Sequence, residues 1–540
     1  MSANRPPMVR RRVGLIAALV LAVVAVLAPG WISTGSLLAL VRVPLESVVV
    51  VLILAGLRRP FARRTVSILA AMVFVATIAL AALDRGFRST VGQPFNVVTG
   101  WPEVRDAYGV LRDSAGPVAS VTLLILIPLS FSAVTLILAG AFLRITDAVG
   151  RHRRPAAIGG FVIAASWIAL GFSGAQVVPG ESVAAADTIH TVVVKAEQVR
   201  IADADQARFA RASATDEYAR LPASSLLTGL KGKDVVVAFI ESYGQVAVQD
   251  TFFSVGVDDV LRRGNAELAA AGYQERSAFL TSPTFGGISW LAHSTLQTGL
   301  WIDSQQKYDQ VTAGNRLTLS KAFAEAGWHT ISDVPSDTGS WPIGRSFYHF
   351  GTELTSQNVG YQGPPFSYAL IPDQYTWEYF QKHELAGPHR PLMAEIDLVS
   401  SHTPWTPLPH EVPWTAVGDG SLYDPQPDQG LSPSEVWQNP HLVQQLYGQS
   451  VEYSLSTLIS FLTTYDNPNL VLVVLGDHQP ATVVSGEGAN HTVPISIISR
   501  DPEVMSRIAS WQWQPGMLPD RAAPEWRMDE FRDRFFAAFE

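Results

Sequence analysis

The chain has 540 residues, of which 47% are hydrophobic and 16% are charged, with a formal net charge of −9 at pH 7. Soluble globular chains carry about 25% charged residues, so the deficit indicates membrane spans attached to a globular domain. The sequence contains no cysteine, which excludes disulfides and thiolate metal sites and leaves oxygen and nitrogen as metal ligands. The negative charge argues against a general nucleic-acid-binding protein, which would carry a basic surface.

The apolar residues are concentrated in the first third of the chain. Five segments have lengths near the ~20 residues that a bilayer helix needs: Val13–Pro29, Leu37–Leu57, Val66–Leu83, Val118–Leu143 and Ile158–Val178. Arginines gather at positions 5–12, 58–64 and 144–154, on one side of these spans. Positively charged loops stay in the cytoplasm, so we expect a transmembrane domain over 1–178 with the N-terminus inside and the rest outside. A cleavable signal peptide is the rival interpretation of the first segment, but four further spans disfavour it.

Two charged residues lie within the second expected span, Arg42 and Glu46, four residues apart. A charge inside the membrane can mark a lipid-headgroup or substrate path. A pair at this spacing near the outer interface can also satisfy itself on one helix face, with the arginine reaching the interface. We favour the self-satisfied pair.

The pattern changes after the spans. Residues 179–233 form a connector, in which Ala184–Leu221 lacks glycine and proline and predicts one or two amphipathic helices. From Asp234 onward, short apolar runs alternate with helical stretches, which predicts a doubly wound α/β domain over 234–540 with a largely parallel sheet. The expected strands are Val235–Ile240, His329–Ser332, Met393–Val399, Leu470–Leu475 and Val493–Ser499, and the expected helices include Ser320–Ala326 and Val443–Thr464. Residues 404–440 read as a long surface loop.

Candidate ligands follow two of these strands. Glu241 comes directly after the first strand, and Asp477 and His478 follow the strand Leu470–Leu475. Ligands in α/β sheets bind beyond the carboxyl ends of the strands, and this mixture of oxygen and nitrogen donors suits Mn²⁺, Zn²⁺ or Mg²⁺. An acid after a strand is also a common helix N-cap, so each fragment alone is weak evidence.

A hydroxyl residue lies between these fragments in the sequence. Ser289 follows the pair Gly286-Gly287 and opens a helical stretch. Unpaired N–H groups at a helix N-terminus favour an anion or phosphate, and a nearby metal would lower the pKa of the hydroxyl and make it a nucleophile. Serine is equally well suited to be a simple N-cap, and the local sequence leaves both readings open.

In this order, the fragments FIESYG, GGISW, SSHTPW and GDH resemble the alkaline phosphatase/sulfatase superfamily, and more specifically its lipoteichoic acid synthase branch. That resemblance implies five membrane helices, a helical connector and an extracellular sulfatase-like α/β domain. It implies that one divalent metal ion, Mn²⁺ before Mg²⁺ or Zn²⁺, is held by Glu241, Ser289, Asp477 and His478, with Ser289 as nucleophile. It also implies that His402 acts on the substrate side, that Arg345 contacts phosphate, and that Trp341 lies near the headgroup pocket.

The sequence departs from the superfamily at two points. Serine stands at position 289, where the synthases have threonine, so the hydroxyl is kept. The sulfatase signature Cys/Ser-x-Pro-x-Arg is missing, because Trp290, Leu291, Ala292 and His293 follow Ser289. Without a cysteine to oxidise to formylglycine, sulfate-ester hydrolysis is disfavoured and phosphorus chemistry remains.

Several other residues have two interpretations. His491 would either help to bind a second metal or substrate, or be an ordinary loop histidine. His293 is an outside candidate because it lies close to Ser289 in the sequence. Trp405 and Trp414 would gate the site or simply pack the loop down.

The resemblance therefore implies a metal-dependent phosphotransferase at the outer membrane face. It would move a phospholipid headgroup, phosphoglycerol from phosphatidylglycerol in the first instance, to an envelope glycan or glycerophosphate acceptor through a phospho-serine. A phosphoethanolamine transferase, a phosphodiesterase or sulfatase-type hydrolase, and a ligand-binding protein without activity are the alternatives. The sequence leaves the oligomeric state open.

Overall fold

The computed structural model describes residues 7–102, 104–105, 117–178, 181–222 and 225–540. The arginine at position 5 and residues 179–180 of the expected connector lie outside these ranges. The chain divides into two compact units, Met1–Arg88 with Gln93–Ala204, and Ser89–Gly92 with Asp205–Glu540. The division after Ala204 falls within α7 (Asp187–Ser213), a single helix inside the expected connector.

The first unit is a membrane domain. Among the described residues, four helices are long and apolar enough to cross a membrane: α1 (Pro7–Thr34), α3 (Pro60–Val91), α5 (Pro117–Arg151) and α6 (Arg153–Ser173). Large apolar side chains such as Leu124, Ile127 and Phe161 are exposed on their surfaces. Apolar surface of this extent is stable in lipid rather than in water. The first, third, fourth and fifth expected spans are therefore found as helices.

The second expected span, Leu37–Leu57, is not one continuous helix. It consists of the 3₁₀ helix η1 (Leu37–Val41), the short strand β1 (Val43–Pro44) and the 12-residue helix α2 (Leu45–Gly56). Pro44 occupies the N-cap position of α2, where its missing backbone N–H removes no hydrogen bond within the helix. The prediction of a single unbroken span at this position is wrong.

Arg42 and Glu46 bind the start of α7 inside the first unit. Glu46 Oε1 accepts a hydrogen bond from the backbone N–H of Ile189 at 2.8 Å. The Arg42 guanidinium lies 2.7 Å from a carboxylate oxygen of Asp187, the first residue of α7. A carboxylate at a helix N-terminus satisfies unpaired N–H groups and interacts favourably with the helix dipole. This pair therefore has a structural role that its spacing alone did not indicate.

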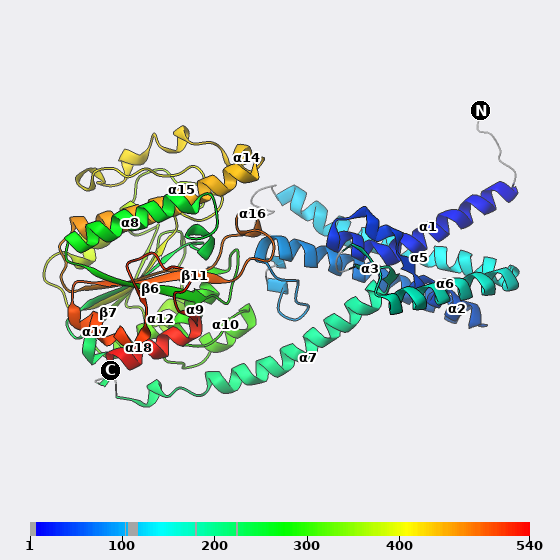
Figure 1. Ribbon diagram of the computed structural model, residues 1–540, viewed down its shortest axis with the longest axis horizontal. Helices are drawn as coiled ribbons and strands as arrows, with labels where there is room; N and C mark the ends of the chain where they lie inside the picture. Colours follow the sequence, from blue (N-terminus) through cyan, green and yellow to red (C-terminus); the bar gives the residue numbers. More distant parts are fainter. Residues whose placement is uncertain (1–6, 103, 106–116, 179–180, 223–224) are drawn as a thin grey trace. The chain divides into compact units, whose positions relative to one another are not determined.

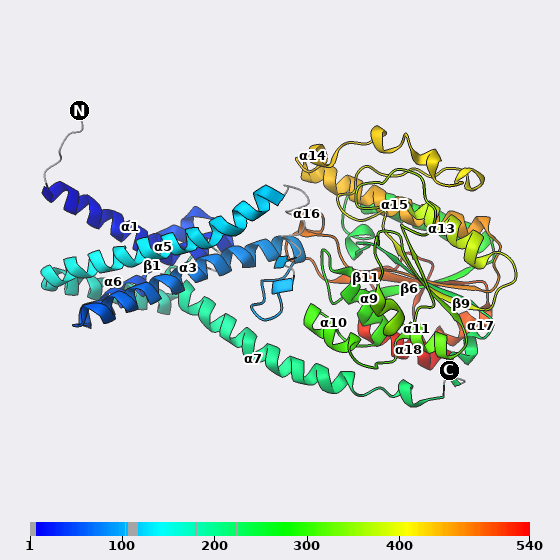
Figure 2. The ribbon, with the colours of Figure 1, turned by 180° about the vertical axis from the view of Figure 1, so that it is seen from behind.

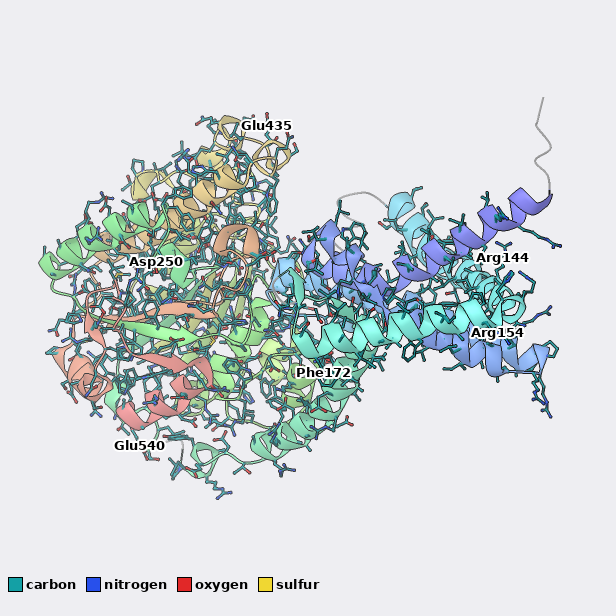
Figure 3. The ribbon with its side chains drawn as sticks, turned by 45° about the vertical axis from the view of Figure 1, so that its right-hand side comes forward. Arg144, Arg154, Phe172, Asp250, Glu435 and Glu540 are labelled. Carbon is teal, nitrogen blue, oxygen red and sulfur yellow. The ribbon has the colours of Figure 1, made fainter. Side chains whose placement is uncertain are left out.

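Small residues let α1 and α5 approach closely. Ala18, Ala22 and Ala25 recur along one face of α1 and are buried in a cluster with Leu138 and Phe142 of α5. Helices in membranes associate through such small-residue faces because lipid supplies no hydrophobic drive between them. Within this unit, Figure 3 shows Arg144 and Arg154 toward one end of the helices and Phe172 at the other end of α6.

The second unit is built on a nine-stranded sheet. Its order is β12-β6-β11-β10-β5-β9-β7-β8, with β13 also paired to β6. Strands β10, β5, β9, β7 and β8 are parallel, whereas β11 runs antiparallel to β10 and β6. The bounds are β5 (Asp234–Ile240), β6 (Gln274–Thr281), β7 (His329–Val334), β8 (Thr352–Thr355), β9 (Leu392–Leu398), β10 (Leu470–Gly476), β11 (Thr492–Ser499), β12 (Gln514–Pro515) and β13 (Glu525–Arg527).

Helices cover both faces of this sheet (Figures 1 and 2). Helices α8 (Ser254–Ala270) and α15 (Pro440–Thr464) lie on one face, and α9 (Ser289–Thr298), α11 (Leu319–Glu325) and α18 (Phe531–Phe539) lie on the other. All seven residues of β5 are buried, because side chains alternate between the two helical layers. The remaining helices of this unit are α10 (Gln305–Thr312), α12 (Pro342–Ser346), α13 (Asp373–Phe380), α14 (Pro433–Val436), α16 (Thr482–Ser485) and α17 (Pro502–Arg507). The first unit also contains three short strands, β2 (Gln176–Val178), β3 (Glu181–Ser182) and β4 (Ala184–Ala185).

The predicted doubly wound α/β domain is confirmed, and each of the five predicted strands is present. Strand β6 was not predicted, because Gln274, Glu275 and Arg276 interrupt the apolar pattern. The antiparallel direction of β11 was also left undetermined, because direction depends on pairing partners and not on local composition.

The central strands should dominate the stability of the second unit. Leu472 on β10 is completely buried, whereas Leu422 is 47% exposed. Leu472→Ala is expected to lower the free energy of unfolding by about 2–5 kcal/mol because it removes buried methyl groups and leaves a cavity. The matched change Leu422→Ala should cost under about 0.5 kcal/mol in the same denaturation experiment. Equal losses for the two variants would contradict this packing.

Candidate active site

Two neighbouring strands end at the same level and carry the candidate ligands. Strands β5 and β10 are parallel partners, with Gly476 opposite Ile240. The next residues are therefore Asp477 on one strand and Glu241 on the other, at the carboxyl edge of the sheet. Gly476 is required for this approach, since a Cβ there would lie 1.9 Å from the carbonyl oxygen of Tyr243.

Asp477 is held by one of its two oxygens. Its Oδ1 accepts hydrogen bonds from the backbone N–H groups of Ser242 and His478, each at 2.7 Å. Its Oδ2 is buried and accepts no hydrogen bond from any described residue. Burial and the neighbouring Glu241 carboxylate raise the pKa of Asp477 to about 6. A buried carboxylate oxygen without a donor is costly unless a cation binds it.

The Nε2 atom of His478 lies close to the carboxylates of Asp477 and Glu241. Its Nδ1 lies 2.8 Å from the carbonyl oxygen of Gln479 and so donates to it, which leaves Nε2 unprotonated in the neutral ring. The Nε2 atom lies 3.3 Å from Asp477 Oδ2 and 3.4 Å from Glu241 Oε1. A backbone acceptor on the far nitrogen is the usual support of a metal-binding histidine.

Ser289 reaches this point from the opening turn of α9. The preceding Gly287 and Ile288 have φ of 150° and 66°, a left-handed conformation that is unusual for isoleucine and turns the chain sharply into the helix. Ser289 Oγ lies 3.0 Å from Glu241 Oε2, to which it donates, and 3.2 Å from His478 Nε2. Ile288, not Ser289, occupies the N-cap position, so the simple N-cap interpretation of Ser289 is wrong.

These four side chains fit one divalent cation. The ligand atoms of Glu241, Asp477 and His478 all lie within 4.8 Å of one another, and the Ser289 hydroxyl adjoins two of them. The unpartnered Asp477 Oδ2 and the unprotonated His478 Nε2 are the donors that such an ion would complete. Three oxygen donors and one imidazole nitrogen suit Mn²⁺ or Zn²⁺, and Mg²⁺ less well.

A cavity of about 580 Å³ opens beside Ser289 and Glu241, and His402 is part of its lining. The His402 ring stacks on Tyr368 with centroids 3.4 Å apart and planes 11° from parallel. Its Nδ1 lies 2.5 Å from the carbonyl oxygen of Thr403. Burial lowers the pKa of His402 to about 4, so the ring is neutral at pH 7.

The structure separates the two residues that the resemblance placed in the headgroup pocket. Trp341 lines the cavity. Arg345, in the last turn of α12, is exposed and is not among the residues that line the cavity. The phosphate contact of Arg345 stays a prediction, which the lining of this cavity does not support.

A second group of titratable residues also lines the cavity. His293 Nδ1 lies 3.2 Å from Glu395 Oε1 and 3.5 Å from Asp397 Oδ1, and the ring stacks on Phe239 at 3.8 Å. From the sequence, His293 was only an outside candidate, and neither acid was predicted to belong to the site. Their signal was the spacing of two within β9, which puts Glu395 and Asp397 on one face of an otherwise apolar strand.

The remaining candidates lie elsewhere. His491 belongs to neither group of potential metal ligands among the described residues; its carbonyl accepts a hydrogen bond from Ser282, and its ring contacts Phe285. Trp405 is 2% exposed and donates to the carbonyl of Ser401, so it packs the long loop down rather than gating the site. Trp414 likewise donates to Ser460 Oγ.

Comparison with known proteins gives similar folds only. No protein-family model matches the sequence, and no curated protein matches it significantly. Similar solved structures include the lipooligosaccharide phosphoethanolamine transferase EptA from Neisseria meningitidis, at 14% identity and TM-score 0.45 over 98% of this chain and 95% of that chain. The lipoteichoic acid synthase LtaP from Listeria monocytogenes is 11% identical (TM-score 0.37, 58% and 74%). The phosphoglycerol transferase GacH from Streptococcus pyogenes is 12% identical (TM-score 0.36, 62% and 91%).

A lipoteichoic acid synthase, the type of protein that the sequence motifs resemble, is thus among the similar structures. Identities of 11–14% assign no activity to this chain. Its chemistry follows from its own side chains.

Metal binding should depend on the converging ligands. We expect His478→Ala and Asp477→Asn to weaken Mn²⁺ binding more than about 100-fold in calorimetric titrations, since each removes a ligand held by a fixed outer contact. His491→Ala is the matched control and should bind Mn²⁺ like the parent. Unchanged affinity in both ligand variants would rule out the shared site.

The His293 ion pairs should make stability depend on pH. Burial lowers the pKa of His293, but the carboxylates of Asp397 and Glu395 outweigh it and raise the pKa to about 9. A pKa raised above its unfolded value of about 6.5 stabilises the fold below that pH, and this contribution is lost as the pH rises through about 9. His293→Gln should therefore lower Tm more at pH 7 than at pH 10. A loss of the same size at both pH values would contradict the charged state.

Proposed function

We propose that this chain is a divalent-metal-dependent phosphotransferase that moves the headgroup of a membrane phospholipid through a phospho-Ser289 intermediate. The observation that supports this most directly is the position of Ser289 Oγ, at 3.0 Å from Glu241 Oε2 and 3.2 Å from His478 Nε2, beside an open cavity. A serine hydroxyl is a weak nucleophile unless a base or a metal activates it.

In the first half-reaction, Ser289 Oγ attacks the phosphorus of the lipid phosphodiester. The bond from phosphorus to the diacylglycerol oxygen breaks, the hydroxyl proton leaves along the hydrogen bond to Glu241, and diacylglycerol takes a proton from solvent. When bound to Glu241, Asp477, His478 and Ser289, a divalent ion supplies charge stabilisation for the transferring phosphoryl group. The N–H groups in the first turn of α9 favour the same negative charge.

In the second half-reaction, an acceptor hydroxyl attacks the phospho-serine. The neutral His402 ring takes the acceptor proton and passes it to solvent, the bond between phosphorus and Ser289 Oγ breaks, and Glu241 returns its proton to Ser289 Oγ. The stack on Tyr368 and the contact with the Thr403 carbonyl hold the His402 ring in place for this step.

The membrane domain supports a lipid substrate. Four helices long enough to span a bilayer keep the catalytic unit at the membrane, which raises the effective concentration of a lipid headgroup at the cavity. The arginine clusters favour a cytoplasmic N-terminus and an extracellular catalytic unit. The acceptor would then be an envelope glycan or a glycerophosphate polymer.

Phosphoglycerol is the headgroup that the sequence resemblance favours, with Mn²⁺ as the metal. Phosphoethanolamine transfer is the alternative with the same nucleophile. If water replaces the acceptor, the enzyme is a phosphodiesterase, and headgroup phosphate is released without any added acceptor.

Activity should depend on the hydroxyl at position 289. With Mn²⁺ and fluorescent phospholipids in mixed micelles, Ser289→Ala is expected to lower diacylglycerol release on the order of 10³-fold or more. Ser289→Thr, which keeps the hydroxyl, should retain activity, and Ser346→Ala, an exposed serine outside the cavity, should match the parent. Intact mass should show a phosphorylated species in the parent and none in Ser289→Ala. Undiminished turnover by Ser289→Ala would refute the proposal.

A further inference from the structure

An apolar groove of about 430 Å³ opens on the surface of the membrane domain. Its walls come from α2, α3, α6 and the start of α7, and they include Phe74 and Trp167. Val49, Val73 and Ile189 also line the groove and are 44%, 45% and 61% exposed, so it is open to the outside of this unit. An apolar cavity of this kind does not hold water, and the solvent around membrane helices is hydrocarbon.

Two polar side chains line this otherwise apolar groove, those of Glu46 and Thr188. Both residues are more than nine-tenths buried. The Thr188 Oγ1 atom has no hydrogen-bond partner among the described residues. The Glu46 carboxylate accepts the backbone N–H groups of Ile189 at 2.8 Å and of Thr188 at 3.4 Å, which leaves further lone pairs on both oxygens. A buried hydroxyl without a partner is unfavourable, so this end of the groove suits the polar group of a ligand.

The polar and apolar lining residues come from different parts of their helices. Glu46 and Thr188 belong to the first turns of α2 and α7. Val73 and Phe74 lie near the middle of α3, which has 32 residues. A lipid has the same division, with a polar group at the membrane interface and hydrocarbon towards the bilayer centre. An amphiphile with its polar end at Glu46 and Thr188 therefore matches the groove along its length.

The carboxylate of Glu46 restricts which polar group can bind. A lipid phosphate would face this carboxylate at low dielectric, where two negative charges repel each other strongly. The nearby Arg42 already binds Asp187 and the carbonyl oxygen of Ser182. A hydroxyl group can donate to the carboxylate and accept from the Thr188 hydroxyl, so it satisfies both residues without adding charge. The lining therefore favours a neutral lipid alcohol over a phospholipid.

We propose that this groove binds diacylglycerol, with the free hydroxyl between Glu46 and Thr188 and one acyl chain along Val73 and Phe74. The other acyl chain stays in the bilayer. The assignment rests on the proposed function for the source of the ligand, since diacylglycerol is the lipid product of that phosphotransfer. The groove is distinct from the cavity beside Ser289, because the two share no lining residue in the described part of the chain.

Photo-crosslinking in the full-length Ser289→Ala variant tests the groove separately from turnover. In phosphatidylcholine nanodiscs, a diacylglycerol with a diazirine within one acyl chain should label Val73 or Phe74, as mapped by mass spectrometry. Unlabelled diacylglycerol should compete with the probe. Its 3-O-methyl ether and phosphatidic acid, with the same acyl chains, should each compete at least about fivefold less well, because the ether cannot donate to Glu46 and the phosphate is repelled by it. Equal competition by the three lipids would overturn the proposal.

Variants of the lining provide the second test. Thr188→Val removes the hydroxyl at nearly constant volume and should weaken diacylglycerol binding about fivefold. Val73→Trp fills the groove from its open side and should abolish labelling. The matched control is Thr146→Val, since Thr146 is buried outside the groove and its Oγ1 donates to the Phe142 carbonyl. This control should label like the parent, and unchanged labelling in both groove variants would overturn the proposal.

The two proposals can fail independently. Specific labelling of the groove without turnover of any phospholipid by the parent would support the groove and reject only the proposed function. Phospholipid turnover that depends on Ser289, without specific labelling of α2 or α3 by diacylglycerol, would overturn the groove and leave the proposed function standing.

Discussion

The Asp477 carboxylate is the constraint on which the site depends. Two backbone N–H groups fix its Oδ1, and they come from the ends of two different strands, through Ser242 after β5 and His478 after β10. The other oxygen is buried and unpartnered among the described residues. Burying an ionised oxygen without a partner is unfavourable. A divalent cation that binds this oxygen removes the unfavourable desolvation, which makes metal binding more favourable. The rest of the site is arranged around that atom.

The surrounding structure makes this arrangement rigid. The parallel register of β5 and β10 puts Glu241 and Asp477 at the same level, and Gly476 removes the Cβ that would collide with Tyr243. The left-handed Ile288 then turns α9 so that its first residue, Ser289, faces both ligands. Strain at Ile288 and burial at Asp477 both lower stability, and the two fully packed layers of the sheet offset them.

The local sequence pattern was sufficient to predict several of the candidate metal ligands. Glu241, Asp477 and His478 follow apolar strands, and strands of one parallel sheet present their carboxyl ends at one edge, so their convergence follows from sequence and topology together. The role of Ser289 could be decided only from the backbone conformation, because serine is common both at the N-cap and in the first turn of a helix. Motif matching alone did not place Arg345, which is exposed and is not among the residues that line the cavity. Glu395 and Asp397 were missed because β9 reads as a buried strand, and only tertiary pairing reveals that one face lines a cavity. The break at Pro44 could not be predicted from the proline alone, because α1 and α5 continue through Pro29 and Pro128.

The proposed chemistry requires that residues from three distant parts of the chain share one cation. Anomalous diffraction from crystals of the full-length protein loaded with Mn²⁺ measures this directly. We expect a manganese peak bonded to the side chains of Glu241, Ser289, Asp477 and His478. A peak bonded only to His293, Glu395 and Asp397, with none beside Ser289, would contradict it.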